Sequence, residues 1–385
     1  MRRFGLLIVA LVLGGCGGAT APPLPSSAIA HDGSLQRHSV GLGKVLTSKS
    51  GQVFGYDIDQ SGKDGVLATA SDVETFDQDT GRITKSFPRR PSGRISFSAD
   101  GIVAGDVGLI TRYVTPKHSI YAKRFYDVMN PVTAKTFTGT WTPPVKDVQV
   151  EAAGPNQSTS TTAIFAIELK NQDMPILFAS NVAKNTFGKV FALDPSAFSL
   201  GDQPQVAQDS TTGQAVIATS PDGGRVGGAA PINVLVDLQT GKQTQWNGLN
   251  NGPFGAGFVN GLAVDSATGV AATTTELNAQ VEFYDLAQET GTATQLPCTG
   301  SSSQYNSGWG VTNDSVNGLF LVSAPIYCSG SQGSAIVVYD EKGDLVESIT
   351  GFTMPIGVGG VAINPSKRMG WAVGPQINQL QQFFY

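Results

Sequence analysis

Short apolar segments alternate with polar turn sequences along most of the chain, and a stretch near its middle shows the pattern most clearly. An apolar run at 262–264 leads into the turn sequence DSATG at 265–269, and residues 270–275 return from it. Residues 281–285 then lead to a second turn, which we expect at 288–291. Asp, Thr and Gly in these positions are typical of tight turns. The pattern predicts three consecutive antiparallel strands with no helix between them.

Related copies of this unit recur through the chain, and each ends its third strand on an aromatic or aliphatic residue that Asp follows in all but the last. The copies lie 43 to 67 residues apart, close to the period of a four-stranded propeller blade. Strands such as 319–322 and 336–339 are apolar without alternation, as in sheets that are buried on both faces. The third strands end at Phe76, Tyr126, Leu193, Val236, Tyr284, Tyr339 and Phe384. The predicted fold is all-β, a seven-bladed β-propeller.

The last copy lacks a fourth strand, because the sequence ends with its third strand. The segment 39–47, SVGLGKVLT, belongs to no other copy and has the character of a strand. We therefore expect the last blade to be completed by this N-terminal strand, which removes two open sheet edges at once. The propeller domain is predicted to span 39–385.

The V-x-x-Y-D-x-x-T-G phrasing that the copies approximate resembles the YVTN, NHL and WD-repeat kinds of bacterial β-propeller. That resemblance covers roughly residues 39–385, and it implies a fold and not a reaction. The Asp residues of the series, together with Asp209 and Asp265, are predicted to cap turns through their own side chains.

The first 15 residues are predicted to be a signal peptide. Arg2 and Arg3 precede an apolar segment at 4–13, which is too short to span a bilayer. The sequence Leu-Gly-Gly-Cys ending at Cys16 resembles the lipobox of bacterial lipoproteins, which implies that Cys16 becomes the lipidated first residue. An ordinary secretory signal with an incidental cysteine is the alternative.

Residues 16–38 are small, polar and contain proline, and they are predicted to be a flexible tether. Several acyl chains on one residue hold a protein firmly to a membrane. The protein is therefore expected to be exported and lipid-anchored to the bacterial membrane. Gly17 after the cysteine resembles sorting to an outer membrane where one exists.

Two further cysteines, Cys298 and Cys328, are expected to form a disulfide, since export leads to an oxidising compartment. A metal site built from two thiols is the alternative. The three histidines, at 31, 38 and 118, lie far from both cysteines in sequence, which disfavours it.

Long, varied loops are predicted on one face of the propeller and short Gly-rich turns on the other. Aromatic and amide residues gather in or beside the long loops, where they suit a sugar, a peptide or a partner protein. This candidate ligand face consists of Trp141, Phe254, Phe258, Asn260, Tyr305 and Trp309. The alternative is that these groups fill the mouth of the central channel and contact one another.

The region 82–146 carries eleven Lys or Arg against three acidic residues, whereas 201–385 carries five against fourteen. A basic sector of this kind could contact anionic lipid or acidic polysaccharide. The candidate basic patch consists of Arg89, Arg90, Arg94, Arg112, Lys117, Lys123 and Arg124. The alternative is a solvated surface without a ligand.

No catalytic motif stands out, since the chain has no G-x-S-x-G, no H-E-x-x-H and no phosphate loop. The phrase Asn260-Gly261-Leu262-Ala263 resembles gluconolactonase-like propellers, in which the asparagine binds a divalent ion. That likeness implies the alternative function, a metal-dependent lactonase or hydrolase. The favoured interpretation is an envelope module that binds a protein or a glycan, without cofactor or metal, as a monomer. A purely structural envelope scaffold is a third possibility. A net charge of −5 argues against nucleic acid as a partner.

Overall fold

The chain divides into two units, residues 1–37 and residues 38–385. The computed structural model describes most of the second unit. Within the described part, no helix is long and apolar enough to cross a membrane. The described residues are 40–59, 62–69, 72–88, 101–104, 107–114, 123–129, 136–137, 144–145, 148–155, 161–168, 174–181, 186–198, 204–220, 230–248, 258–275, 279–297, 308, 310–328, 331–354, 356, 361–373 and 378–385.

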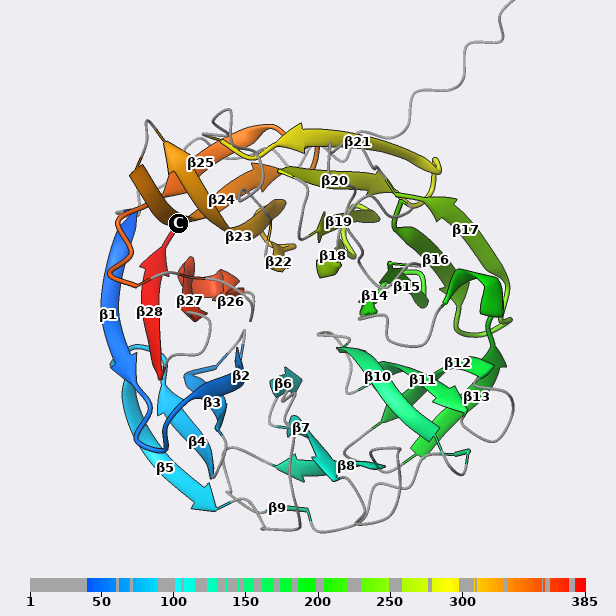
Figure 1. Ribbon diagram of the computed structural model, residues 1–385, viewed down its shortest axis with the longest axis horizontal. Coiled ribbons are helices and arrows are strands. Elements are labelled where there is room, and N and C mark those ends of the chain that lie inside the picture. The colour runs from blue at the N-terminus through cyan, green and yellow to red at the C-terminus, as the bar shows by residue number, and fades with distance from the viewer. Residues whose placement is uncertain are drawn as a thin grey trace, which may run out of the picture. The chain divides into compact units, whose positions relative to one another are not determined.

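The described strands form seven four-stranded antiparallel sheets arranged around a central axis (Figure 1). Sheet 1 consists of β2 (Val53–Ile58), β3 (Asp64–Thr69), β4 (Asp72–Asp77) and β5 (Arg82–Pro88). Sheet 2 consists of β6 (Gly101–Ala104), β7 (Val107–Val114), β8 (Lys123–Met129) and β9 (Thr136–Phe137). Sheet 3 consists of β10 (Val148–Pro155), β11 (Thr161–Glu168), β12 (Met174–Asn181) and β13 (Thr186–Ala192), followed by the 3₁₀ turn η1 (Pro195–Ala197).

The remaining sheets have the same order, with the first strand of each nearest the axis (Figure 1). Sheet 4 consists of β14 (Gln205–Asp209), β15 (Gln214–Thr219), β16 (Ile232–Asp237) and β17 (Gln243–Asn247). Sheet 5 consists of β18 (Val259–Asp265), β19 (Val270–Thr275), β20 (Gln280–Asp285) and β21 (Thr290–Gln295). Sheet 6 consists of β22 (Gly310–Asp314), β23 (Leu319–Cys328), β24 (Ser331–Asp340) and β25 (Leu345–Ile349). Sheet 7 consists of β26 (Val361–Asn364), β27 (Met369–Val373), β28 (Gln379–Phe384) and β1 (Gly41–Thr47), with the 3₁₀ turn η3 (Pro365–Lys367) after β26.

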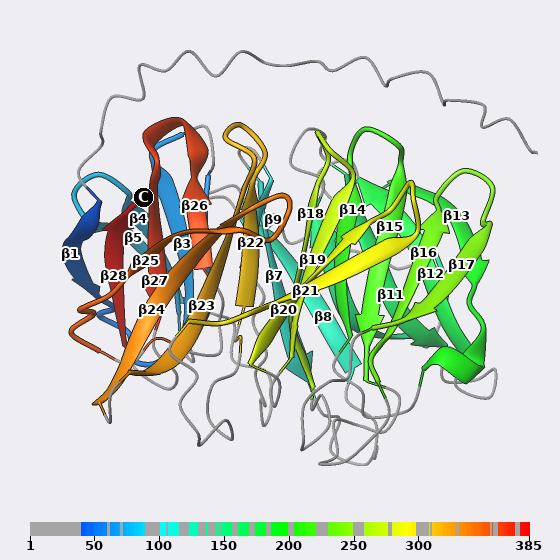
Figure 2. The ribbon, with the colours of Figure 1, turned by 90° about the horizontal axis from the view of Figure 1, so that it is seen from above.

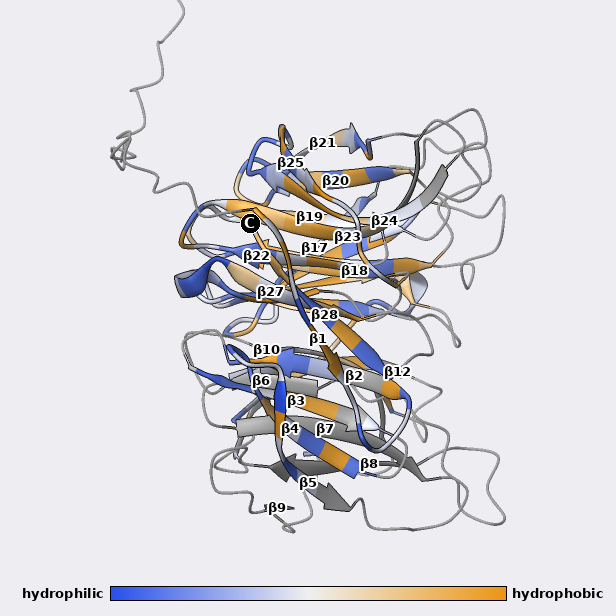
Figure 3. Ribbon diagram, turned by 90° about the vertical axis from the view of Figure 1, so that its left-hand side faces the viewer, coloured by the Kyte–Doolittle hydropathy of each residue, from blue (hydrophilic) through white to orange (hydrophobic). Residues whose placement is uncertain are grey.

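Sheet 5 packs against a neighbour on both faces, which explains its apolar strands without alternation. In β19, Ala272 contacts the cluster that contains Phe320 of sheet 6, whereas the adjacent Ala271 contacts the cluster that contains Val216 of sheet 4. Figure 3 shows hydrophobic residues concentrated in such strands. The predicted all-β propeller is confirmed, and the seven sheets of the described strands agree with the number of repeats.

Tight turns connect the first strand to the second in several sheets, all at one end of the molecule (Figure 2). We call this end the turn face. The carboxylate of Asp209 accepts a hydrogen bond from the backbone N–H of Thr211 (2.8 Å), and that of Asp314 accepts one from Val316 (3.0 Å). The turns end at glycines in the left-handed region, such as Gly269 at φ 73°. Asp314 is an additional cap that the prediction did not include. Of the predicted caps, the side chain of Asp127 lies outside the description. The prediction is confirmed for Asp77, Asp194, Asp209, Asp237, Asp265, Asp285 and Asp340.

The turn between β20 and β21 differs from its predicted position at 288–291. Glu289 takes the left-handed conformation, with φ 55°, and Gly291 lies inside β21 opposite Tyr284. A Cβ at Gly291 would lie 3.1 Å from the ring of Tyr284, so the glycine provides space for that ring. The glycine therefore has a packing role and not the turn role that its position suggested.

The N-terminal strand completes the last sheet as predicted. β1 pairs antiparallel with β28, with Gly41 opposite Phe384 and Leu46 opposite Leu380. Figure 3 shows the two strands side by side. The ring is thus closed by residues from both ends of the propeller sequence.

Candidate functional site

Most of the predicted ligand face lies outside the described residues, which include only Phe258 and Asn260 of its six members. The structure therefore does not test whether the six residues come together. Trp141, Phe254, Tyr305 and Trp309 lie outside the described part of the chain.

The two cysteines, the lipidation site and the basic patch are described only in part. Cys16 and Cys298 lie outside the described residues, and Cys328 is described as the last residue of β23, opposite Ser331. Arg112 belongs to β7, and Lys123 and Arg124 belong to β8. The other members of the patch, Arg89, Arg90, Arg94 and Lys117, lie outside the description. The disulfide and the patch stay predictions.

The start of β18 is the described part of the ligand face, and it bridges three sheets. Asn260 donates a hydrogen bond through its side-chain amide to the backbone carbonyl of Gly308, 3.3 Å away, before sheet 6. The backbone N–H of Val259 donates to the hydroxyl of Ser220, at the end of sheet 4, over 3.1 Å. Asn260 and Phe258 are both partly exposed. Solvent therefore still reaches the side chain of Asn260, although it also joins sheet 5 to the residue before sheet 6.

Gly261, the second residue of the Asn-Gly phrase, lies where two inner strands approach closely. A Cβ at this position would be 2.6 Å from the backbone nitrogen of Val311 and 2.9 Å from the Cα of Gly310. Real Cβ contacts essentially never fall below 3.0 Å. The glycine is thus required by packing between sheets 5 and 6, and Asn260 has a structural partner in Gly308.

The described residues include no group of three or more His, Cys, Asp or Glu side chains that could hold a metal ion. The carboxylates at the turn face accept hydrogen bonds within their own turns. The carboxylate of Asp237 accepts hydrogen bonds from the backbone N–H groups of Thr240 and Gln239. These hydrogen bonds hold the pKa of Asp237 below the usual range. In Asp77, burial raises the pKa, but hydrogen bonds from the hydroxyl and N–H of Thr80 outweigh that effect and the net pKa is lowered.

Asp265 differs from Asp77 and Asp237. It is fully buried, and burial raises its pKa despite a hydrogen bond from the N–H of Ala267 at 2.8 Å. Its Oδ2 atom has no hydrogen-bond partner in the described parts of the chain. The nearby carboxylate of Asp314 raises the pKa further. The ionised form of Asp265 is therefore less well accommodated than that of Asp77 or Asp237.

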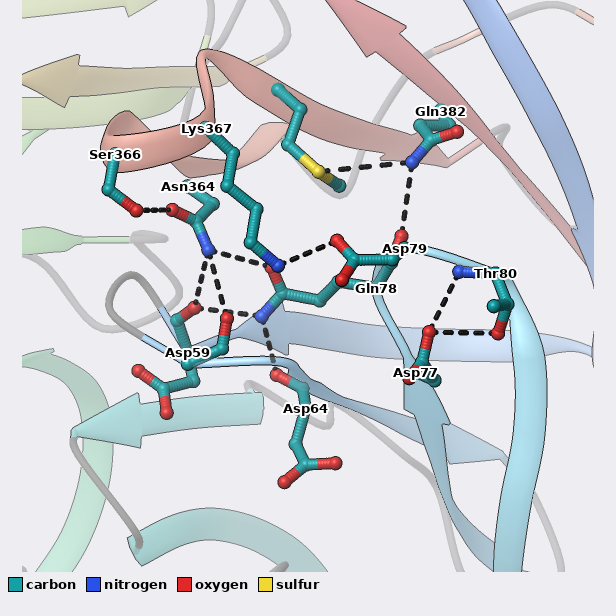
Figure 4. Close-up of polar contacts among 12 residues, drawn as sticks. Asp59, Asp64, Asp77, Gln78, Asp79, Thr80, Asn364, Ser366, Lys367 and Gln382 are labelled. Atoms are coloured by element: carbon teal, nitrogen blue, oxygen red, sulfur yellow. Dashed lines mark hydrogen bonds and ion pairs between the residues drawn. The ribbon is translucent and has the colours of Figure 1, made fainter.

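A buried polar network joins sheet 1 to sheet 7, and sequence reasoning did not find it (Figure 4). We call Gln78, Asn364 and Gln382 the seam network. The amide of Asn364 donates to the side-chain oxygen of Gln78 over 3.0 Å, and the amide of Gln78 donates to the backbone carbonyls of Asp59 and Asp64, both over 2.7 Å. The amide of Gln382 donates to the backbone carbonyl of Gln78 over 3.0 Å. All three side chains are at most 3% exposed.

An ion pair and an aromatic contact accompany the seam network. The Nζ atom of Lys367 lies 2.6 Å from Oδ1 of Asp79 at the surface. Solvent screening keeps the contribution of such an ion pair to stability small. The rings of Phe76 and Trp371 meet edge to face at 5.4 Å, and the hydroxyl of Tyr56 donates to the carbonyl of Trp371. The join between the two ends of the propeller thus contains both polar and apolar contacts.

No protein-family model matches the chain, and no curated protein matches it. Several solved structures share its fold. A chain of the "Crystal Structure of Mitotic Checkpoint Complex" has a TM-score of 0.63 at 11% identity, covering 98% of this chain and 99% of that one. "Structure of U3-55K" has a TM-score of 0.58 at 13% identity, and the match covers 89% of this chain and 98% of that one. "Crystal structure of RRP9 WD40 repeats" has a TM-score of 0.58 at 13% identity, and the match covers 88% of this chain and 96% of that one. At these identities the likeness establishes the β-propeller fold alone.

Proposed function

We propose that this protein is an exported lipoprotein whose β-propeller binds a partner protein or a glycan at the cell envelope. The lipid anchor is Cys16, and the membrane is the outer one where a bacterium has it. The leader sequence from Arg2 to Cys16 supports export and anchoring. The propeller supports a binding role, because its sheets form a rigid ring that presents loops at each end.

The observation that carries the binding role is the contrast between the two ends of the ring. At the turn face, carboxylates such as Asp209 and Asp314 are engaged by N–H groups of their own turns. At the other end, the start of β18 leaves Phe258 and Asn260 partly exposed. An aromatic ring beside an amide suits contact with a peptide or a sugar. We therefore assign binding to the end that carries the long loops.

Protein binding is further supported by the similar solved structures. One of them is a mitotic checkpoint complex, so a propeller of this form occurs within a protein assembly. This support is by analogy of fold, and it leaves the choice between a protein and a glycan to experiment.

Anchoring is tested by Cys16→Ser. We expect the wild-type protein to sediment with membranes and to carry an acyl label, whereas the variant loses the label and is released from the membrane. Equal membrane association and equal labelling of both proteins would contradict the anchor.

The binding face is tested by a photo-crosslinking amino acid introduced at Phe258 in intact cells. Thr292, which is exposed on the outer strand β21, is the matched control position. We expect a discrete adduct from position 258 that position 292 does not give. Protease and glycosidase digestion then distinguish a protein from a glycan. Adducts of equal yield from both positions, or none from position 258, would rule out this face.

A further inference from the structure

Strand β1 buries little of its own surface in the ring. Of its seven residues, all of them described, Leu46 alone is buried. Val45 is 44% exposed, and Val40, just before the strand, is 42% exposed. The pairing with β28 is also irregular between Leu42 and Val45. Apart from Leu46, the side-chain contacts of β1 include those of the partly buried Leu42 and a surface hydrogen bond from the Lys44 ammonium to the carbonyl of Asp79 (2.8 Å). Backbone hydrogen bonds to β28 therefore provide much of its attachment.

Sheets 1 and 7 remain joined by contacts that do not include β1. The hydrogen bonds from Asn364 and from Gln382 to Gln78 connect β26 and β28 to the end of β4. The contact between Phe76 and Trp371 connects β4 to β27. Strands β26, β27 and β28, which carry the sheet 7 side of these contacts, lie closer to the axis of the ring than β1 does (Figure 1). The ring therefore has a second closure in addition to the strand.

The chain is fixed again directly after β1. Glu74 is fully buried in β4, and its Oε1 atom accepts hydrogen bonds from the N–H of Lys49 (3.1 Å) and the hydroxyl of Ser50 (2.8 Å). Hydrogen bonds to a buried carboxylate are stronger than those between neutral groups. A loss of β1 that begins at its N-terminal end would thus stop before β2.

We propose that β1 is a releasable strand, and that its departure opens the edge of β28 to an extended segment of a partner protein. The segment adds to the sheet in the register of β1, as in strand addition to an exposed sheet edge. This goes beyond the proposed function, since it requires neither Cys16 nor the face around Phe258.

The position of Leu46 defines the chemistry of the segment. Leu46 is 1% exposed and lies in one apolar cluster with Leu380, Val53 and Trp371. An incoming strand must place an aliphatic side chain there, whereas a polar one would be buried without a partner. At the position of Val45, which is exposed, the side chain is free to vary.

The test uses the full mature chain and a fluorescent synthetic peptide of its own residues 38–50, with binding followed by anisotropy. Leu46→Ala weakens the attachment of β1, and Val45→Ala, on the same strand, is the matched control. We expect Leu46→Ala to bind the peptide about tenfold more tightly than wild type, because the fraction with a free β28 edge rises. Val45→Ala should bind like wild type, and a peptide carrying Leu46→Asp should not bind.

Circular dichroism in the aromatic region shows whether the ring persists, and Leu46→Val serves as a milder variant if Leu46→Ala does not fold. We expect a native aromatic signal in every variant that binds, with Leu46→Val intermediate in affinity. Equal binding by the Leu46 variants and Val45→Ala would overturn the proposal. So would the absence of binding, or binding accompanied by loss of the aromatic signal.

Discussion

The side-chain amide of Asn364 lies 3.0 Å from the side-chain oxygen of Gln78, and 286 residues of sequence separate the two. Both side chains are fully buried. A buried polar atom costs free energy unless it is hydrogen-bonded, and this bond satisfies the side-chain oxygen of Gln78. The seam network is thus a specific recognition between the first sheet and the last.

We expect Asn364→Ala to lower the free energy of unfolding by about 1–3 kcal/mol, because it leaves the buried oxygen of Gln78 without a donor. Gln379→Ala is the matched control in the same sheet, since its bond to Thr47 is exposed and 3.5 Å long. Its effect should stay within about 0.5 kcal/mol. Urea unfolding of both variants measures the two changes in the free energy of unfolding. Equal losses of stability would show that the seam network does not help to close the ring.

Asp265→Asn should stabilise the protein at neutral pH. The pKa of Asp265 is raised in the folded state, so the stability contributed by the neutral acid is complete below the unfolded pKa of about 3.9 and is lost as pH rises through the folded value. Asparagine keeps an acceptor for the N–H of Ala267 and is never charged. Melting temperatures between pH 3 and pH 8 should show an advantage for the variant that shrinks as pH falls.

Asp237→Asn should behave in the opposite way. Hydrogen bonds from Thr240 and Gln239 lower the pKa of Asp237, so its contribution is present above the unfolded pKa and is lost as pH falls through the folded one. The variant should therefore be less stable than wild type at pH 7, with the deficit vanishing in acid. The same pH trend in both variants would refute the assigned environments.

Gly261→Ala should destabilise the protein by about 1–3 kcal/mol, since the added methyl group meets the backbone of Val311. Gly188→Ala is the control, because a Cβ there meets Ala179 at an ordinary 3.6 Å. Removing a glycine from the unfolded chain should make that control neutral or more stable by up to about 1 kcal/mol. A neutral Gly261→Ala would show that sheets 5 and 6 can move apart at no cost.

Cys298 and Cys328 are predicted to be oxidised in the exported protein. We expect the purified mature chain to show these two thiols only after reduction and unfolding. Loss of the bond should cost about 3–4 kcal/mol for a loop of this size in the chain-entropy model. Free thiols in the protein isolated from the envelope would show that the pair stays reduced.

The turns and the closure could be predicted from sequence because they are local or periodic. An Asp followed by Thr and Gly marks its own turn, and the missing fourth strand of the last repeat pointed to residues 39–47. Gln78 and Asn364 could not be found in this way, since nothing in the residues around either one specifies a partner so distant. The pairing arises only when the ring brings both ends of the domain together.

Asn260 and Gly261 show a second limit of sequence reasoning. The phrase suggested a ligand or an ion, and it did not reveal that Asn260 also donates to Gly308 or that Gly261 provides space for the neighbouring strand. Close packing between sheets places the same small and amide residues at strand starts as a binding site would. Gly291 likewise suggested a turn, and its role is to provide space for Tyr284.

The pairing of β1 with β28 also determines when the last sheet can form during folding. Lys44 and Gln382, which bond across this pair, are 338 residues apart. As the chain is synthesised, β1 emerges early and has no sheet to join until the last strand has followed it. Contacts of such long sequence separation form slowly, and unpaired strand edges favour aggregation while they wait. The last sheet is thus assembled only after the whole domain has been made, and a chain stalled before that point would expose β1 to chaperones and proteases.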